Sequence, residues 1–490
     1  MLKTAELGRS LSKEQYDAVL PSLRTAMLDA QARLRNAGFP VVVLVGGADG
    51  AGKSETVNAL HEWFDARFLR AESWAPPTEE ESAHPEFWRY WLWLPPAGRI
   101  AVFSGAWYTE PIHDRVWNGI SDLELSERTA RINGFERTLA DGGTLFVKLW
   151  FHIGKKAQRR RLKELESKKT TRFRVLKQDW KNHERYDQLI KVTEQVISHT
   201  STGYAPWNVI DGEDTRYRNI TAARAILDAI EARLAQPRPT PSAARLPKIA
   251  DPDTLLDKLD LTQALTKHDY EESVPRLQAR LFGLVRKLKK RDKSALLVFE
   301  GPDAAGKGGA IRRITWALDA RSYRLIPIAA PTDEERAHHY LWRFWRHLPR
   351  RGKVTIFDRS WYGRVLVERV EGFASEPEWQ RAYQEINEFE RELWRSGVVL
   401  VKFWLQISPE EQLRRFDERR QDPAKRYKIT AEDYRNREQA NQYEAAAAEM
   451  VSRCSPPEAP FTLVEANDKR FARVKVLQTL CDRLEAACKE

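Results

Sequence analysis

The sequence repeats itself: shifted by 254 residues, its first half aligns with its second half over most of their length. Gly46–Ser54 (GGADGAGKS) falls on Glu300–Gly308 (EGPDAAGKG), and Phe103–Tyr108 (FSGAWY) falls on Phe357–Tyr362 (FDRSWY). Solenoid repeats are only about 20–50 residues long. The much longer period therefore indicates two tandem copies of a whole domain.

The predicted boundaries between the two copies follow from composition. Residues 235–253 are rich in Pro and Ala, which is the composition of an extended linker. We therefore predict a first domain at residues 1–234 and a second domain at residues 254–490. Each domain would contain roughly 235 residues, near the upper end of the usual range for a domain.

Each copy alternates short apolar runs with longer amphipathic ones, which predicts strands alternating with helices. Strands that are apolar throughout indicate a parallel sheet covered on both faces, so we predict a three-layer α/β unit for each copy. In the second copy the predicted strands are Ala295–Phe299, Tyr323–Ile328, Val354–Phe357, Val398–Leu405 and Phe461–Val464. The predicted helices include Lys307–Leu318, Asp333–Trp345, Glu378–Ser396 and Pro409–Arg420.

The composition bounds the class of protein and the kind of partner. Hydrophobic residues make up 42% of the chain, enough for folded cores rather than disorder. Lys and Arg number 81 against 70 Asp and Glu, an excess that suits nucleic acid, an acidic membrane or a phosphate-rich substrate. The apolar runs have the length of strands, so no membrane span is expected. With three cysteines and no signal-peptide pattern, we expect a cytoplasmic protein.

A phosphate-binding loop is predicted in each copy, after a strand and before a helix. Gly47–Ser54 has the pattern G-x-x-x-x-G-K-[ST], whose backbone N–H groups and lysine surround phosphate oxygens. In the second copy Gly308 replaces the hydroxyl residue that normally ligates Mg²⁺. Asp303 could supply the missing oxygen ligand, or it could simply cap the turn. The candidate phosphate-binding residues are Gly47, Asp49, Gly52, Lys53 and Ser54 in the first loop, and Gly301, Ala304, Ala305, Gly306, Lys307 and Gly308 in the second.

The second copy also carries a strand that ends in a carboxylate. Val354–Asp358 is an apolar run closed by Asp358, which would face the phosphate loop and hold Mg²⁺. Arg359 follows with a guanidinium suited to phosphate oxygens. The first copy has Ser104 and Gly105 at these two positions. We therefore predict that the second domain is catalytic and that the first is degenerate and non-catalytic.

A basic segment at residues 409–440 is interrupted by Asp422-Pro423, which predicts a helical hairpin like the lids of nucleotide kinases. A pair of solvated charged helices is the alternative, because acids are interspersed among the cations. The equivalent segment of the first copy, Lys155–Arg185, has 13 Lys or Arg against four acids, so we expect it to bind polyanions. The predicted phosphate-binding lid residues are Arg414, Arg415, Arg419, Arg420, Lys425 and Arg426.

Two tryptophan-rich stretches, Phe87–Leu94 and Tyr340–Leu348, could stack on nucleic-acid bases. Aromatic residues at helical spacing more often form a stripe that faces the core, with charges pointing outward. We favour the core interpretation and expect no nucleic-acid partner.

Between Val298 and Phe373 the second copy reads VFEGPDAAGKGGAIRRIT, then AAPTDEER, then TIFDRSWYGRVLVERVEGF, and these motifs resemble those of the family-2 polyphosphate kinases. The tandem arrangement resembles the two-domain branch of that family, the polyphosphate:AMP phosphotransferases. The resemblance implies P-loop kinase domains with helical lids. It also implies Mg²⁺-dependent transfer of a phosphoryl group from inorganic polyphosphate to AMP, giving ADP.

The resemblance further implies roles for particular residues. The chain departs from the family at Gly363, where Asn is common after Trp-Tyr, and at Ser104 and Gly105 of the first copy. The implied catalytic residues are Asp303, Lys307, Asp358 and Arg359, and Asp303 and Asp358 are the implied metal ligands. The implied nucleotide-binding residues are Pro331, Thr332, Arg364 and Glu368.

Two other functions fit part of the sequence. An ATP-dependent nucleoside monophosphate kinase would need the same loop and lid with a different donor. A P-loop protein that binds polyanions or nucleic acid without catalysis would fit the basic segments but has no need of Asp358. The polyphosphate length preference, the favoured direction, the acceptor base and the oligomeric state stay open, with a homo-oligomer among the options.

Overall fold

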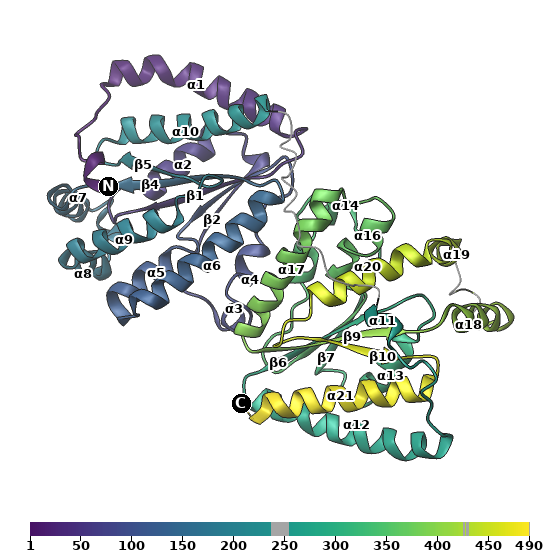
Figure 1. Cartoon of the computed structure of the whole chain (residues 1–490). Helices are drawn as coiled ribbons and strands as arrows, with labels where there is room; N and C mark the ends of the chain where they lie inside the picture. The colour runs from purple at the N-terminus through teal and green to yellow at the C-terminus, as the bar shows by residue number, and fades with distance from the viewer. Residues whose placement is uncertain (237–253, 425–426, 428–430, 490) are drawn as a thin grey trace. The chain divides into compact units, whose positions relative to one another are not determined.

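The structure of the protein, a computed structural model, describes residues 1–236, 254–424, 427 and 431–489. Most of the predicted linker, together with Lys425 and Arg426, lies outside these residues. The chain divides into two compact units (Figure 1). In described residues, unit 1 comprises 1–76, 93–236 and 333–339, and unit 2 comprises 77–92, 254–332 and 340–489.

Unit 1 is built on a five-stranded parallel sheet. Its strands are β1 (Val41–Gly47), β2 (Leu69–Ser73), β3 (Ile100–Ser104), β4 (Leu145–His152) and β5 (Trp207–Asp211), in the order β2-β3-β1-β4-β5. The five residues from Val41 to Val45 are all buried, so the central strand has no solvent face. The main helices are α1 (Lys13–Leu34), α2 (Lys53–Trp63), α6 (Asp122–Asp141), α7 (Lys155–Ser167), α8 (Lys177–Glu184), α9 (Tyr186–Thr200) and α10 (Thr215–Ala235). In Figure 1, α1 and α10 cover one face of the sheet, and α6 and α9 cover the other.

Unit 2 repeats this architecture. Its strands are β6 (Ser294–Glu300), β7 (Tyr323–Pro327), β8 (Val354–Asp358), β9 (Val398–Gln406) and β10 (Phe461–Glu465), in the order β10-β9-β6-β8-β7. The main helices are α12 (Lys267–Lys290), α13 (Lys307–Trp316), α17 (Glu376–Arg395), α18 (Pro409–Gln421), α19 (Ala431–Glu438), α20 (Ala440–Arg453) and α21 (Lys469–Lys489). In Figure 1, α12 and α21 lie on one face, and α17 and α20 lie on the other. The predicted fold class, two tandem α/β domains with parallel sheets, is confirmed.

The structure corrects one predicted helix. Asp333–Trp345 is not continuous but forms two single turns, α14 (Asp333–Arg336) and α15 (Trp342–Trp345). The ring of His338 hydrogen-bonds the carbonyl oxygen of Glu334 at 2.8 Å, which satisfies an acceptor at the end of α14. After the break, the three aromatic side chains of α15 are buried, as the core interpretation of the aromatic stretches predicts.

A buried polar network sits behind the sheet of unit 2. The Nζ atom of Lys402, on β9, lies 2.6 Å from Glu390 and donates to the hydroxyl of Tyr362 at 3.0 Å. The indole of Trp361 donates to Glu390 at 3.0 Å, and Tyr362 donates to the same oxygen. A buried charge pair of this kind needs all of these partners to offset its lost hydration. The Trp-Tyr pair shared by both copies therefore has a structural role.

Unit 1 contains the same network at the aligned positions. Lys148 lies 2.8 Å from Glu136 and donates to Tyr108 at 2.9 Å, and Trp107 donates to Glu136 at 3.0 Å. Both units thus anchor the segment after their third sheet strand in the same way. No helix among the described residues is both long and apolar enough to cross a membrane.

Candidate active site

The phosphate-binding loop of unit 2 joins the carboxyl end of β6 to the start of α13. Gly301 has φ of 138°, and a Cβ there would lie 2.4 Å from the carbonyl oxygen of Leu405, so only glycine fits. Gly306 has φ of 104° and precedes the first turn of α13. Within the described residues, the backbone N–H groups of Gly306, Lys307 and Gly308 make no hydrogen bond. These donors at the positive end of the helix are available to phosphate oxygens.

Lys307 folds back onto its own loop. Its Nζ donates to the carbonyl oxygens of Gly301, at 2.6 Å, and Pro302, at 3.1 Å. Burial and the positive charge of Arg359 lower the pKa of Lys307 from its ordinary value. If a phosphate group entered the loop, Lys307 could donate to its charged oxygens instead of to the two neutral carbonyl oxygens. Hydrogen bonds to charged acceptors are the stronger ones. Lys307 is therefore placed to bind a phosphate that enters the loop.

The carboxylate of Asp303 is held by side chains from two other elements. Oδ1 accepts a hydrogen bond from Arg359 at 2.6 Å, and Oδ2 accepts one from Asn436 at 2.9 Å. The backbone carbonyl of Asp303 accepts from Gln412 at 3.0 Å. Burial opposes the charged form, but the charges of Lys307 and Arg359 and these hydrogen bonds outweigh it and lower the pKa of Asp303. Asp303 thus joins the loop to Arg359 and α19.

Asp358 and Arg359 stand at the end of β8. The register of β8 on β6 places Asp358 opposite Phe299, at the edge where the loop begins. Within the described residues the Asp358 carboxylate makes no hydrogen bond or ion pair. Arg359 has φ of 65°, a left-handed conformation that costs a non-glycine residue roughly 1–2 kcal/mol, and Gly105 of unit 1 has the same φ. A strained non-glycine residue at this position marks Arg359 as a candidate functional residue.

Glu300 is a site residue that the sequence analysis missed. It ends β6, is only 4% exposed, and accepts a hydrogen bond from the hydroxyl of Ser360 at 2.8 Å. Burial raises the pKa of Glu300 to about 7, despite that hydrogen bond and the positive charges of Lys307 and Arg359. Comparing the two copies could have indicated this residue, because the first copy has Gly46 at the aligned position and the two copies therefore differ there in charge.

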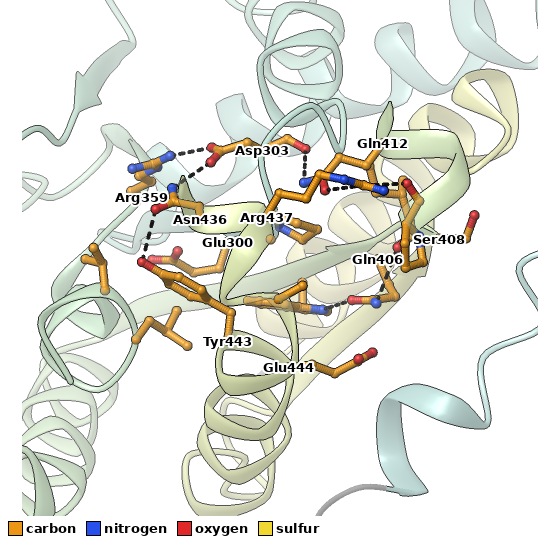
Figure 2. Close-up of a pocket in the computed structure, with 18 of the residues that line it drawn as sticks. Glu300, Asp303, Arg359, Gln406, Ser408, Gln412, Asn436, Arg437, Tyr443 and Glu444 are labelled. Carbon is orange, nitrogen blue, oxygen red and sulfur yellow. Dashed lines mark hydrogen bonds and ion pairs between the residues drawn. The ribbon is translucent and has the colours of Figure 1, made fainter. Parts of the chain in front are cut away.

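Glu300, Asp303 and Arg359 line a cavity of about 160 Å³, shown in Figure 2, whereas Lys307 and Asp358 are outside its described lining. Of the predicted site residues, the structure brings Gly301, Asp303 and Arg359 into the described lining. Lining residues that no motif indicated are Glu300, Gln406, Ser408, Gln412, Asn436, Arg437, Tyr443 and Glu444. Two of them could have been found from the repeat, because Gln158 and Asn182 of unit 1 stand at the positions of Gln412 and Asn436. Gln158 and Asn182 also make the same contacts to Asp49.

Comparison with known proteins gives the family. The family described as polyphosphate kinase 2 (PPK2) matches residues 10–238 and 264–490, once in each copy. The chain belongs to the polyphosphate kinase 2 family. It is the two-copy form of that family, because both matches lie in one chain.

Full-length relatives in this family resemble the whole chain. A protein of Pseudomonas aeruginosa named polyphosphate:AMP phosphotransferase is 50% identical and covers 100% of both chains. A protein of the same name from Acinetobacter johnsonii is 37% identical over 97% of each chain. A crystal structure from Pseudomonas aeruginosa PA01, whose description names polyphosphate kinase 2, superposes with a TM-score of 0.91 at 49% identity and covers 100% of both chains.

Within this polyphosphate kinase 2 fold, Arg415 supports the loop rather than lining the cavity. It is 2% exposed, and its guanidinium donates to the carbonyl oxygens of Ala304 at 2.9 Å, Ala466 at 2.6 Å and Asn467 at 2.8 Å. Glu411 lies 2.5 Å from the same guanidinium. Arg415 therefore ties the loop to the end of β10. Of the other predicted lid cations, Arg414, Arg419 and Arg420 are outside the described lining of the cavity, and Lys425 and Arg426 are outside the described residues.

None of the four predicted nucleotide-binding residues is in the described lining of this cavity. Arg364 lies 3.1 Å from Glu368 and over the ring of Tyr340, 4.5 Å from its centroid. Their neighbours Gly363 and Val367 do line the cavity. The assignment of Pro331, Thr332, Arg364 and Glu368 to nucleotide binding stays a prediction.

Asp303 and Asp358 are the carboxylates available to a metal ion. The negative charge of each carboxylate favours the protonated forms of Lys307 and Arg359, so both carboxylates lie close to these two cations. The described residues contain no group of three or more His, Cys, Asp or Glu side chains that could hold a metal. Mg²⁺ is commonly bound by one or two carboxylates together with water and substrate phosphates. Two carboxylates beside a phosphate loop fit that mode of binding.

Unit 1 keeps the loop but not the charged groups around it. Lys53 donates to the carbonyl oxygens of Gly47 at 2.7 Å and Ala48 at 3.2 Å, as Lys307 does in unit 2. Asn182 donates to Asp49 at 2.8 Å. The cavity in front of this loop is larger, about 420 Å³. Gly46, Ser104 and Gly105 line it in place of Glu300, Asp358 and Arg359.

Proposed function

We propose that the protein transfers a phosphoryl group from inorganic polyphosphate to AMP, giving ADP, and that unit 2 performs the reaction. The observation that carries this proposal is the 50% identity, over 100% of both chains, to a polyphosphate:AMP phosphotransferase. The site of unit 2 supports it, because the start of the phosphate loop, Asp303 and Arg359 line one cavity and Asp358 ends the neighbouring strand.

The chemistry required is mainly charge stabilisation. Polyphosphate and AMP are both anions, so bringing them together is electrostatically unfavourable. Lys307 and the free N–H groups of the loop bind donor oxygens, and Arg359 places a second cation beside them. These groups are held in place before the reaction and stabilise the negative charge of the transition state.

Asp303 and Asp358 would hold Mg²⁺ in the proposed reaction. When bound, Mg²⁺ would offset negative charge on the phosphate oxygens. Asp303 also orients Arg359 through their 2.6 Å hydrogen bond. An AMP phosphate oxygen is ionised at neutral pH, so in-line attack on the terminal phosphate needs no strong base.

Glu300 limits the negative charge at the site. Because burial raises its pKa to about 7, Glu300 is less fully ionised near neutral pH than an exposed glutamate. A neutral carboxyl next to the loop repels incoming phosphates less than a carboxylate does. Glu300 therefore shapes the cavity without adding a full negative charge.

The test is ADP formation from AMP with polyphosphate and Mg²⁺, compared with ATP as the donor. We expect polyphosphate to support the reaction and EDTA to abolish it. Turnover with ATP alone would instead indicate a nucleoside monophosphate kinase. The control is Lys307→Ala, which removes the loop cation and should lose activity with either donor.

A further inference from the structure

The segment Lys155–Arg185 of unit 1, here called the cationic arm, consists of α7, a short turn at Arg172–Arg174 and α8. It has 13 Lys or Arg and four acids. Three of the acids are already engaged: Glu164 pairs with Lys168, Glu166 accepts from Trp180, and Asp179 accepts from the N–H of Leu176. The arm therefore carries a large positive excess that it does not neutralise itself.

Some of the arm's cations have a structural role. Arg161 and Arg174 lie 3.0 Å and 3.8 Å from Glu55, and Lys155 lies 2.6 Å from Asp187. Seven others are exposed and make no hydrogen bond or ion pair within the described part of the chain. These seven are Lys156, Arg159, Lys163, Lys169, Arg172, Lys177 and Lys181.

The exposed cations are arranged in rows. Lys156, Arg159 and Lys163 are spaced i, i+3 and i+7 on α7, so they lie on one face of that helix. Lys177 and Lys181 are spaced i and i+4 on α8 and share a face of that helix too. A row of cations suits an extended, flexible polyanion better than a single compact phosphate.

The equivalent helix of unit 2, α18, does not carry the same row of exposed cations. At the positions of Lys156 and Lys163 the second copy has Glu410 and Asp417. Its Arg414 is neutralised within α18, 2.7 Å from Glu411 and in contact with Glu418. Unit 2, which has Asp358 and Arg359, thus pairs the arginine at this position within α18. Unit 1, which lacks those two residues, has the exposed cations that are unpaired within the described residues.

We propose that the cationic arm of unit 1 is a docking surface for inorganic polyphosphate, which keeps the donor chain bound to the enzyme while unit 2 uses it. The inference rests on the proposed function, which makes polyphosphate the polyanion this protein meets. Each exposed contact is weak, but a polymer meets several at once. Holding the donor on the same molecule raises its effective concentration at the active site.

The test variant is Lys156→Glu/Lys163→Asp in the full-length protein, which installs the residues of the second copy. We expect the Kd for long-chain polyphosphate to rise by about tenfold or more, and the KM for long chains to rise with it. The KM for AMP and for polyphosphate of a few units should change much less. The loss of binding should shrink at high salt, because salt screens exposed charges.

The control is Lys287→Glu/Lys290→Glu on α12, which changes the net charge by the same amount on exposed residues outside the cationic arm and outside the described lining of both cavities. Equal effects of the two pairs would show a general charge effect and overturn the proposal. An unchanged Kd for long polyphosphate in the test variant would also overturn it. So would tighter binding of single-stranded DNA than of polyphosphate to the arm, which would make it a nucleic-acid surface. Failure of the proposed function would appear separately, as wild-type protein that binds polyphosphate but forms no ADP.

Discussion

The residues that separate the two copies lie at one sheet edge. Asp358 and Arg359 of unit 2 correspond to Ser104 and Gly105 of unit 1, and Glu300 corresponds to Gly46. The backbone at Arg359 keeps the left-handed φ of 65° that Gly105 adopts without strain. These three positions, which are equivalent in the two backbones, therefore account for the loss of charged groups from the site of unit 1, which keeps Asp49 and Lys53.

Asp358→Asn should abolish most phosphoryl transfer while leaving the fold intact. The carboxylate makes no hydrogen bond or ion pair among the described residues, so replacing it should change the melting temperature by little. An amide would hold Mg²⁺ poorly, and we expect kcat to fall by about 10³-fold. Steady-state kinetics with polyphosphate and AMP, and thermal unfolding, check the two halves of this prediction. A kcat within about tenfold of wild type would contradict it, since that is only ~1.4 kcal/mol of barrier.

Glu300→Gln should change how stability depends on pH. Burial raises the folded-state pKa of Glu300 from 4.5 to about 7, so the folded protein holds this proton more tightly than the unfolded chain. Its contribution is therefore favourable at low pH and is lost as the pH rises from about 4.5 to 7. The loss is on the order of 3 kcal/mol at most. Melting curves in EDTA at pH 5 and pH 8 should show wild type losing more stability than the Gln variant. Parallel pH dependence in the two proteins would refute this.

At the scale of elements, the two units brace their loops with different helices. In unit 2, Arg415 of α18 donates to the carbonyl oxygens of Ala304 and Ala466. In unit 1, the aligned Arg161 pairs with Glu55, and the buried Arg218 of α10 donates to Gly212 instead. The carbonyl oxygen that follows the last strand is thus held by the lid helix in unit 2 and by the last helix in unit 1.

Arg415→Ala should therefore act mainly on stability. The substitution leaves three carbonyl oxygens without their donor and removes one of the two arginines that pair with Glu411. Losing a buried pair of this kind costs about 3–5 kcal/mol, whereas Arg420→Ala on the exposed side of the same helix should cost less than about 0.5 kcal/mol. Denaturant unfolding of both variants measures this difference. Equal stability of the two, with a higher KM for polyphosphate in Arg415→Ala, would instead support direct phosphate binding by Arg415.

At the scale of the whole molecule, the chain holds two loops of the same form with different surroundings. Lys53 and Lys307 make the same pair of contacts to their own loop carbonyls. Unit 2 adds Asp358 and Arg359, where unit 1 has Ser104 and Gly105, while the loop aspartate is present in both units as Asp303 and Asp49. The two units therefore provide a matched internal comparison.

Lys307→Ala should lower kcat by about 10³-fold, and Lys53→Ala should leave kcat within about twofold of wild type. Both variants remove the same contacts from the same kind of loop, so a difference between them reports catalysis and not loop stability. Initial rates at saturating polyphosphate and AMP provide the measurement. If the two variants lose kcat equally, unit 1 takes part in catalysis.

The architecture of this protein could be predicted from local patterns in its sequence. The repeat, the apolar strands and the loop motifs are local patterns, and they located all five strands of the second copy to within one residue at each end. They also indicated Asp303, Asp358 and Arg359 as site residues. Local patterns suffice for these features because strand burial and loop geometry depend on residues close together in the chain.

The other residues of the candidate site could be identified only in the folded chain. Asn436 reaches Asp303 from 133 residues away, and burial at the sheet edge gives Glu300 its raised pKa. Arg415 looks like the other lid cations in the sequence, but the fold buries it against the loop. These outcomes depend on desolvation and on hydrogen-bond partners from distant segments, and both exist only once the chain has folded.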